Sequence, residues 1–242
     1  MGNKEEQCDI LDKFKAQVDA TWGSPSAKDF NECLIFATDF STWVECLQDI
    51  PQSILLKSSL NECATANLFC SQGLYKHAMI SLRLCLEHCL YAIHMSSNDF
   101  YFRRWKAGQE DMKWATITDG NTGIFSKSFI RAYAPEFEER SAELNGIVSN
   151  VYRECSEYIH GNYSKLNCLP GENEFSQDML SQYISRFQSI SYVLSIALVI
   201  RFKEQIVSKG LLPTLEDAIT HNIGSLPEIQ LLYSKTEADI YE

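Results

Sequence analysis

Apolar residues recur every three or four positions between Asn61 and His94, and this spacing constrains the fold more than any other feature of the sequence. Residues at such intervals share one face of an α-helix. Gly73 interrupts the pattern, which predicts a short helix followed by a long one. The apolar stripe consists of Leu68, Phe69, Leu74, Tyr75, Ala78, Met79, Leu82, Leu86, Cys89 and Ile93.

Capping signals predict two helices in the third quarter of the chain. Ser126 is a suitable N-cap for a short helix over 127–133. A longer helix is expected from about Phe137 to His160. It would end at Gly161, because glycine tolerates the left-handed conformation that commonly terminates a helix.

The last long helix is predicted from a cap at Ser176 to about Lys209. It contains the apolar stretch ISYVLSIALVI at 190–200. This stretch is shorter than the roughly 20 residues that cross a bilayer, so it predicts a buried core helix.

The chain shows no useful β-alternation and no internal repeat, so we expect an all-α fold. A helical bundle would comprise residues 61–210. A helical extension, 1–60, would precede it, and a tail with short helices, 211–242, would follow. Turn residues predict irregular segments at 100–124 and 162–175.

The charge is acidic but uneven. The chain holds 21 basic and 32 acidic residues, a formal net charge of −11, which argues against a protein that coats nucleic acid non-specifically. Residues 61–160 hold 10 basic and 12 acidic residues, whereas 1–60 hold 5 and 10 and 161–242 hold 6 and 10. The middle of the chain is therefore the first place to look for a polyanion site.

The nine cysteines are an odd number, which argues against a closed disulfide framework. The N-terminus, MGNKEEQCDILDKF, lacks the apolar segment of a signal peptide, so we expect a reduced, cytoplasmic protein without a membrane anchor. Cys85, His88 and Cys89 have the chemistry of metal ligands. They lie in an apolar helical pattern without a second ligand pair, so we expect core cysteines and neither metal nor cofactor.

The segment Tyr152–Gly161 carries the candidate catalytic pair, Arg153 and His160. Seven residues amount to nearly two helical turns, so both side chains leave one face, about 10.5 Å apart along the axis. Arginine offers a fork of donors to a phosphodiester, and histidine moves a proton near neutral pH. Together they suit cleavage of RNA by its own 2′-hydroxyl.

This segment, with the earlier helix bearing Arg83 and Glu87 at i,i+4, resembles the HEPN superfamily of all-α domains with an R-x(4–6)-H motif. The resemblance covers roughly residues 61–205. Many members are metal-independent RNases of toxin–antitoxin, phage-defence and CRISPR systems. The resemblance implies a bundle that dimerises or forms a higher oligomer, with two motifs meeting in one cleft and with Arg153 and His160 as the catalytic pair.

Supporting residues are expected between the pair, where Glu154, Ser156 and Glu157 lie on or near the same face. The family often has Asn, Asp or His directly after the arginine, whereas this chain has Glu154. The two glutamates would repel a phosphate or pair with Arg153. A solvated helix face with an Arg–Glu pair is therefore the alternative interpretation.

A second match to the motif spacing is Arg83 with His88. Residues five apart lie about 140° out of phase on a helix. The neighbours of this pair are apolar, and Glu87 offers Arg83 an ion-pair partner. Arg153 and His160 are thus the preferred pair.

The segment 100–124 is a candidate RNA-binding surface. Basic residues beside Trp105 and Trp114 could hold phosphates while the rings stack on bases. The alternative is a loop whose rings pack on the bundle while its charges face water. The cations of this candidate surface, extended along the following helix, are Arg103, Arg104, Lys106, Lys127 and Arg131.

Two functions follow from these features. The first is a metal-independent RNase acting in antiviral defence or as a toxin, with Arg153 and His160 as its catalytic residues. The second is a non-catalytic helical subunit that binds or regulates a protein partner. The acidic flanks of the chain suit this second function as well as they suit the first.

Overall fold

Helices account for 77 % of the chain in the computed structural model, which describes residues 2–171 and 174–240. No strand occurs within these residues, so the all-α prediction is confirmed. In chain order the elements are α1 (Gly2–Trp22), α2 (Ala27–Cys46), α3 (Ser53–Ser71), α4 (Tyr75–Ser96), α5 (Asp99–Lys106), α6 (Trp114–Ile117), α7 (Lys127–Tyr133), the 3-10 helix η1 (Pro135–Arg140), α8 (Ser141–Ile159), α9 (Tyr163–Asn167), α10 (Gln177–Ser208), α11 (Glu216–Ile223) and α12 (Pro227–Ile240).

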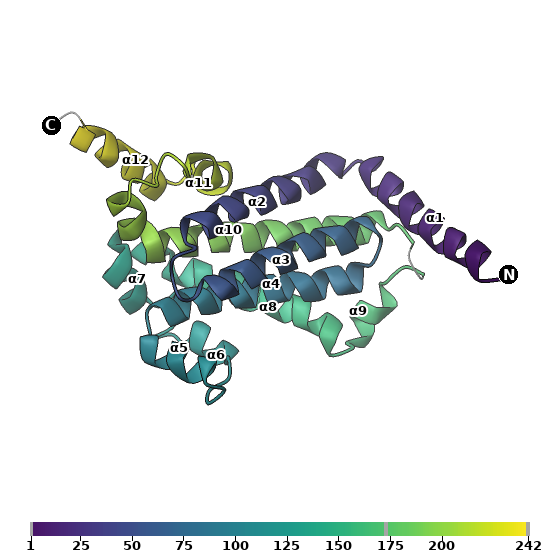
Figure 1. Cartoon of the computed structure of the whole chain (residues 1–242), viewed down its shortest axis with the longest axis horizontal. Coiled ribbons are helices and arrows are strands. Elements are labelled where there is room, and N and C mark those ends of the chain that lie inside the picture. Colours follow the sequence, from purple (N-terminus) through teal and green to yellow (C-terminus); the bar gives the residue numbers. More distant parts are fainter. Residues whose placement is uncertain (1, 172–173, 241–242) are drawn as a thin grey trace.

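The centre of the bundle is α4, which packs against α3, α8 and α10 (Figure 1). Every residue from Cys89 to Ile93 is at most 2 % exposed, as expected of a helix that is apolar all round. Gly73 closes the turn between α3 and α4 with a φ of +74°, a conformation that favours glycine. The predicted break is confirmed. The first helix is longer than expected because its start, SILLKSSL, has no clear apolar stripe.

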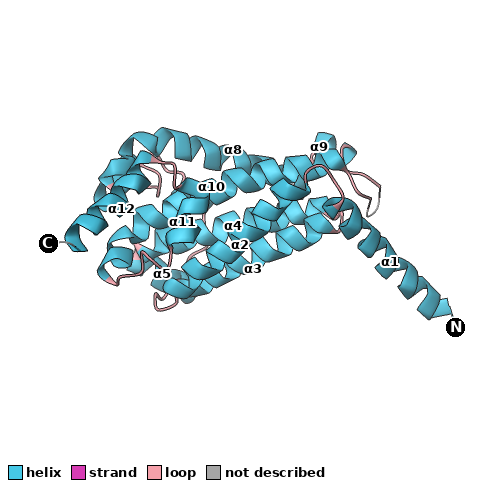
Figure 2. Ribbon diagram, turned by 90° about the horizontal axis from the view of Figure 1, so that it is seen from above, coloured by secondary structure: helices cyan, strands magenta, loops and turns pink. Residues whose placement is uncertain are grey.

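The 32-residue helix α10 runs along the bundle beside α4 and α8 (Figure 2). Ser176 caps it as predicted, since its Oγ accepts a hydrogen bond from the N–H of Met179 at 3.3 Å. By length and composition alone α10 could cross a membrane, but 72 % of its most apolar window is buried inside the protein. Helix α10 is therefore the buried core helix that the apolar stretch predicts.

The N-terminal 60 residues do not form one separate extension. The expected boundary at residue 60 falls inside α3, and α2 shares the hydrophobic core of the bundle. Phe36 of α2 meets Phe187 of α10 edge to face, with ring centroids 5.6 Å apart. Within the expected helical extension, α1 projects away from the bundle (Figure 2).

The C-terminal tail folds back onto the bundle, where apolar side chains such as Ile219 and Ile223 join the hydrophobic core and polar contacts add to them. Nδ1 of His221 in α11 lies 3.0 Å from Oδ2 of Asp39 in α2. Arg140 Nε donates a hydrogen bond to Glu228 Oε1 in α12 at 2.7 Å. The short helices expected in the tail are thus present, and α12 continues to Ile240.

Two segments predicted to be irregular contain short helices. Residues 100–124 include most of α5 and all of α6, and 162–175 include α9. Asn98 and Asn162 cap α5 and α9, accepting hydrogen bonds from Tyr101 N–H and Ser164 N–H at 3.0 Å each. Asparagine is favoured both in turns and at helix N-caps. An asparagine in the sequence therefore does not by itself distinguish a turn from the start of a short helix.

Candidate functional site

The candidate catalytic pair lies at the C-terminal end of α8. The helix ends at Ile159, His160 is its C-cap residue and Gly161 has a φ of +67°. The N–H of Asn162 then donates to the carbonyl oxygen of Glu157 at 3.1 Å, which is the hydrogen bond of a Schellman motif. The predicted stop at Gly161 is confirmed, and it fixes the backbone that carries His160.

One face of α8 is buried and the opposite face is open. Its core residues recur at three- and four-residue spacing and are Leu144, Val148, Val151, Cys155 and Tyr158. Arg153 and His160 fall outside this stripe and are both exposed. The structure therefore leaves both side chains exposed, whereas the spacing predicts only that they leave one face of the helix.

Arg153 has no carboxylate partner among the described residues. Its guanidinium donates a long hydrogen bond from Nη2 to Asn150 Oδ1 at 3.4 Å. Arg201 also lacks a carboxylate, but it is half-buried and donates to the carbonyl oxygen of Ser96 at 2.7 Å. The other six arginines form ion pairs, and they are Arg83, Arg103, Arg104, Arg131, Arg140 and Arg186. Arg153 is thus the exposed arginine whose charge is left uncompensated within the described part of the chain.

The glutamates of the motif helix engage other cations. Glu154 Oε2 lies 3.0 Å from Arg186 Nε on α10, and Glu157 Oε2 lies 3.6 Å from Lys165 Nζ on α9. Neither glutamate forms the ion pair with Arg153 that the alternative interpretation requires. Ser156 donates its hydroxyl proton to the carbonyl oxygen of Tyr152 at 2.6 Å, so its hydroxyl hydrogen is already used inside the helix.

Tyr152, directly before Arg153, is held between two side chains from other helices. Arg83 of α4 donates to its hydroxyl at 2.5 Å, and the Arg83 guanidinium lies 4.4 Å from the ring centroid. Trp114 of α6 stacks on the ring at 3.8 Å with an interplanar angle of 6°. Burial raises the pKa of Tyr152. Sequence reasoning did not find this stack, because no spacing rule links residues from three separate helices.

The second motif match does not assemble. Arg83 turns toward α8 and forms the predicted ion pair with Glu87 at 3.0 Å. His88 turns toward α3, where its Nδ1 lies 3.0 Å from Ser58 Oγ. Burial lowers the pKa of His88. The two side chains diverge, as their phase on the helix predicts.

The cations of the candidate RNA-binding surface are largely compensated by local carboxylates. Arg103 pairs with Asp99 at 2.6 Å and Arg104 with Glu110 at 3.1 Å, and Arg131 pairs with Glu138. Lys106 lies 5.7 Å from the ring of Phe102, and Lys127 is exposed. Figure 1 shows α5 and α6 beneath one end of the bundle and α9, beside the motif, beneath the other.

The rings of this segment pack on the protein, as the alternative interpretation expects. Phe102 is 4 % exposed and lies against Trp105 with centroids 6.0 Å apart, while Trp114 contacts Tyr152. Phe100 is the exception, because it is 72 % exposed.

Two of the three residues with the chemistry of metal ligands, Cys85 and Cys89, are fully buried in the core. Burial raises the pKa of Cys89 well above its ordinary value. Within residues 2–171 and 174–240, no cluster of three or more His, Cys, Asp or Glu side chains could hold a metal ion.

No family model matches the chain, and neither a curated protein nor a solved structure matches it. The likeness to the HEPN superfamily therefore stays a resemblance carried by the motif helix. The chemistry of the site is set by its own side chains, which are an exposed guanidinium without a carboxylate partner among the described residues at Arg153 and an exposed imidazole at His160.

Proposed function

We propose that the chain is a subunit of a metal-independent endoribonuclease of HEPN type, working in the cytoplasm in antiviral defence or as a toxin. The observation that carries the proposal is the freedom of Arg153, which is exposed and has no carboxylate partner among the described residues. A guanidinium committed to a glutamate would gain little by binding phosphate, whereas a free one can form a bidentate pair with it.

The reaction is an attack of the ribose 2′-oxygen on the adjacent phosphorus with departure of the 5′-oxygen. Its products carry a 2′,3′-cyclic phosphate and a 5′-hydroxyl. His160 takes the 2′-hydroxyl proton or gives a proton to the leaving oxygen. Arg153 stabilises the additional negative charge of the phosphorane.

A second copy of the chain would complete this site. Base and acid act on two different oxygens, so two imidazoles serve the reaction better than one. Large apolar side chains next to His160 support self-association there, since Ile159, Tyr163 and Leu166 are 40 %, 81 % and 41 % exposed. Clustered exposed apolar side chains mark interaction surfaces.

The same apolar side chains favour the second candidate function, a non-catalytic subunit that binds a protein partner through the end of α8 and α9. Under this alternative Arg153 and His160 would be contact residues at the interface. RNA cleavage separates the two functions, because only the first requires it.

The test is expression of the wild type beside Arg153→Ala and His160→Ala, followed by cleavage assays with the purified proteins. We expect wild-type RNA cleavage in the presence of a chelator, and a loss of about 100-fold or more in each variant. Arg153→Lys keeps the charge without the fork and should retain partial activity. Ser149→Ala, on an exposed turn of the same helix, is the neutral control.

Cleavage by either alanine variant at the wild-type rate would overturn the catalytic assignment. A wild type that never cleaves RNA but retains one partner protein, which Arg153→Ala and His160→Ala bind less tightly, would favour the interaction subunit instead.

A further inference from the structure

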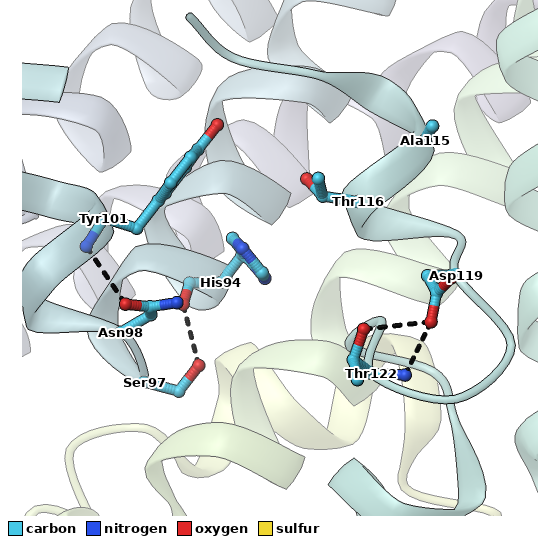
Figure 3. Close-up of a pocket in the computed structure, with 8 residues that line it drawn as sticks. All are labelled: His94, Ser97, Asn98, Tyr101, Ala115, Thr116, Asp119 and Thr122. Atoms are coloured by element: carbon cyan, nitrogen blue, oxygen red, sulfur yellow. Dashed lines mark hydrogen bonds between the residues drawn. The ribbon is translucent and has the colours of Figure 1, made fainter. Parts of the chain in front are cut away.

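A cavity lies away from the Arg153–His160 pair, where the end of α4 meets α5, α6 and the turn that follows α6. Its volume is about 690 Å³, within the usual range for small-molecule sites. Figure 3 shows side chains on two sides of the space. His94, Asn98 and Tyr101 line one side, and Thr116, Asp119 and Thr122 line the other.

The backbone fixes these side chains. Asn98 caps α5 through its Oδ1. Asp119 shapes the turn on the opposite side, because its Oδ1 accepts hydrogen bonds from Asn121 N–H at 2.9 Å, Thr122 N–H at 2.8 Å and the Thr122 hydroxyl at 2.9 Å. The two walls therefore keep their polar groups in place without a ligand.

The hydroxyl groups of the cavity have already donated their protons to the protein. Thr116 donates to the carbonyl oxygen of Lys113 at 2.7 Å, Thr122 donates to Asp119, and Tyr101 donates to the carbonyl oxygen of Asp111 at 2.6 Å. Each oxygen keeps lone pairs that can accept a hydrogen bond. Asp119 Oδ2 has no hydrogen bond among the described residues, so it is a further acceptor.

His94 adds an unsatisfied atom. Its Nδ1 is buried without a hydrogen-bond partner in the described part of the chain, an arrangement that costs free energy unless a ligand or water meets it. Burial lowers the pKa of His94, so its ring is neutral near pH 7. The ring packs edge to face with Tyr101, with centroids 5.4 Å apart, and the two rings offer a π surface to a cation.

The charge of the cavity is negative. The three donors that reach Asp119 lower the pKa of its carboxyl group, so it is ionised near pH 7. Lys113, the N-cap residue of α6, is held by Glu110 at 2.7 Å. An acceptor-rich, negatively charged cavity suits a donor-rich cation and disfavours phosphate or any other anion.

We propose that this cavity binds a small organic cation that carries a primary amine or guanidinium group. Its N–H groups would donate hydrogen bonds to Asp119 Oδ2 and to the hydroxyl oxygens of Thr116 and Thr122. Its positive charge would lie against the rings of His94 and Tyr101. The site is independent of RNA cleavage, and its failure would leave the proposed function untouched.

The test is calorimetric titration of the full chain with agmatine and with putrescine, which present a guanidinium and an amine. Asp119→Asn keeps the oxygen that shapes the turn but removes the charge and the free acceptor. We expect it to weaken binding roughly tenfold, the value of one charge-assisted hydrogen bond. Asn98→Asp keeps the cap of α5 and adds a negative charge, so it should strengthen binding.

The matched control is Asp111→Asn, because Asp111 is exposed, loses the same charge and does not line the cavity. An equal weakening by Asp111→Asn and Asp119→Asn would show diffuse attraction by an acidic protein and overturn the site. Absence of saturable binding by both cations, or tighter binding of inorganic phosphate than of agmatine, would overturn it as well.

Discussion

The ring of Trp114 lies 3.8 Å from the ring of Tyr152 and nearly parallel to it. The contact joins α6, on the segment predicted to bind RNA, to α8, which carries Arg153 at the next position. Since Arg83 of α4 also contacts the Tyr152 ring, three helices meet at one side chain. The segment 100–124 is therefore anchored to the motif helix through rings rather than through charges.

Loss of the Trp114 ring should destabilise the protein. Trp114 is half-buried, so we expect Trp114→Ala to cost about 1–3 kcal/mol, below the value for a fully buried tryptophan. Trp114→Phe keeps a stacking ring and should cost less. Urea denaturation measures both, and equal stability of wild type and Trp114→Ala would show that the stack contributes nothing.

The two arginines of the two motif matches should behave in opposite ways. Arg83 and Glu87 side chains are 16 % and 14 % exposed, so Arg83→Ala leaves a mostly buried carboxylate unpaired and should cost about 2–4 kcal/mol. Arg153→Ala removes an exposed, unpaired side chain and should change stability by less than about 0.5 kcal/mol. Denaturation of both variants checks this, and a large loss with Arg153→Ala would mark Arg153 as structural.

Local signals in the sequence predicted much of the fold. Ser126 and Ser176 both accept the capping hydrogen bonds expected of them, and Gly73 and Gly161 both adopt positive φ. These features depend on residues within a few positions of each other, so one sequence suffices to find them. The bounds of α1 could not be predicted within the expected extension over 1–60, because this helix lacks a strong apolar stripe.

The candidate site was predicted only as far as helix geometry reaches. The seven-residue spacing predicts that Arg153 and His160 leave one face of the helix, and the structure adds that both are exposed. The partners of Glu154 and Glu157 come from Arg186 and Lys165, and tertiary packing selects them. The cavity at His94 likewise combines residues from α4, α5 and α6, whose proximity no local pattern encodes.

Docking of α11 onto α2 should weaken as pH rises. The hydrogen bond to Asp39, and the nearby charges of Asp39, Asp217 and Glu32, raise the pKa of His221. A pKa that is raised in the folded state stabilises the protein fully when the pH is below the pKa of the unfolded state, about 6.5. This stabilisation is lost as the pH rises through the pKa of the folded state.

The measurement for His221 is the difference in thermal stability between wild type and His221→Ala from about pH 5.5 to pH 9. The difference should be largest at the acidic end and smallest at the alkaline end, where only the hydrogen bond of the neutral imidazole to Asp39 remains. His88 and His94, whose pKa values burial lowers, are present in both proteins, so their opposite pH dependence cancels. A pH-independent difference would exclude an ionic contact with Asp39.

Replacement by alanine should change the stability in opposite directions at Gly161, just after α8, and at Gly146, inside α8. Gly161 has a φ of +67°, and an added Cβ would meet only Leu166 Cδ1 at 3.7 Å. Space is therefore available, but the left-handed backbone costs an L-residue about 1–2 kcal/mol, so Gly161→Ala should destabilise by that amount. Gly146 lies inside α8 with nothing within 4 Å of an added Cβ, and Gly146→Ala should stabilise by about 0.5–1 kcal/mol.

Because Gly161 follows His160 directly, Gly161→Ala also tests the placement of the imidazole. We expect it to reduce RNA cleavage by more than its effect on the folded fraction, whereas Gly146→Ala should leave cleavage unchanged. Gly161→Asn, which tolerates the left-handed conformation better, should restore most of both properties. If Gly161→Ala lowered stability but not cleavage per folded molecule, the orientation that the Schellman turn gives His160 would have no part in the reaction.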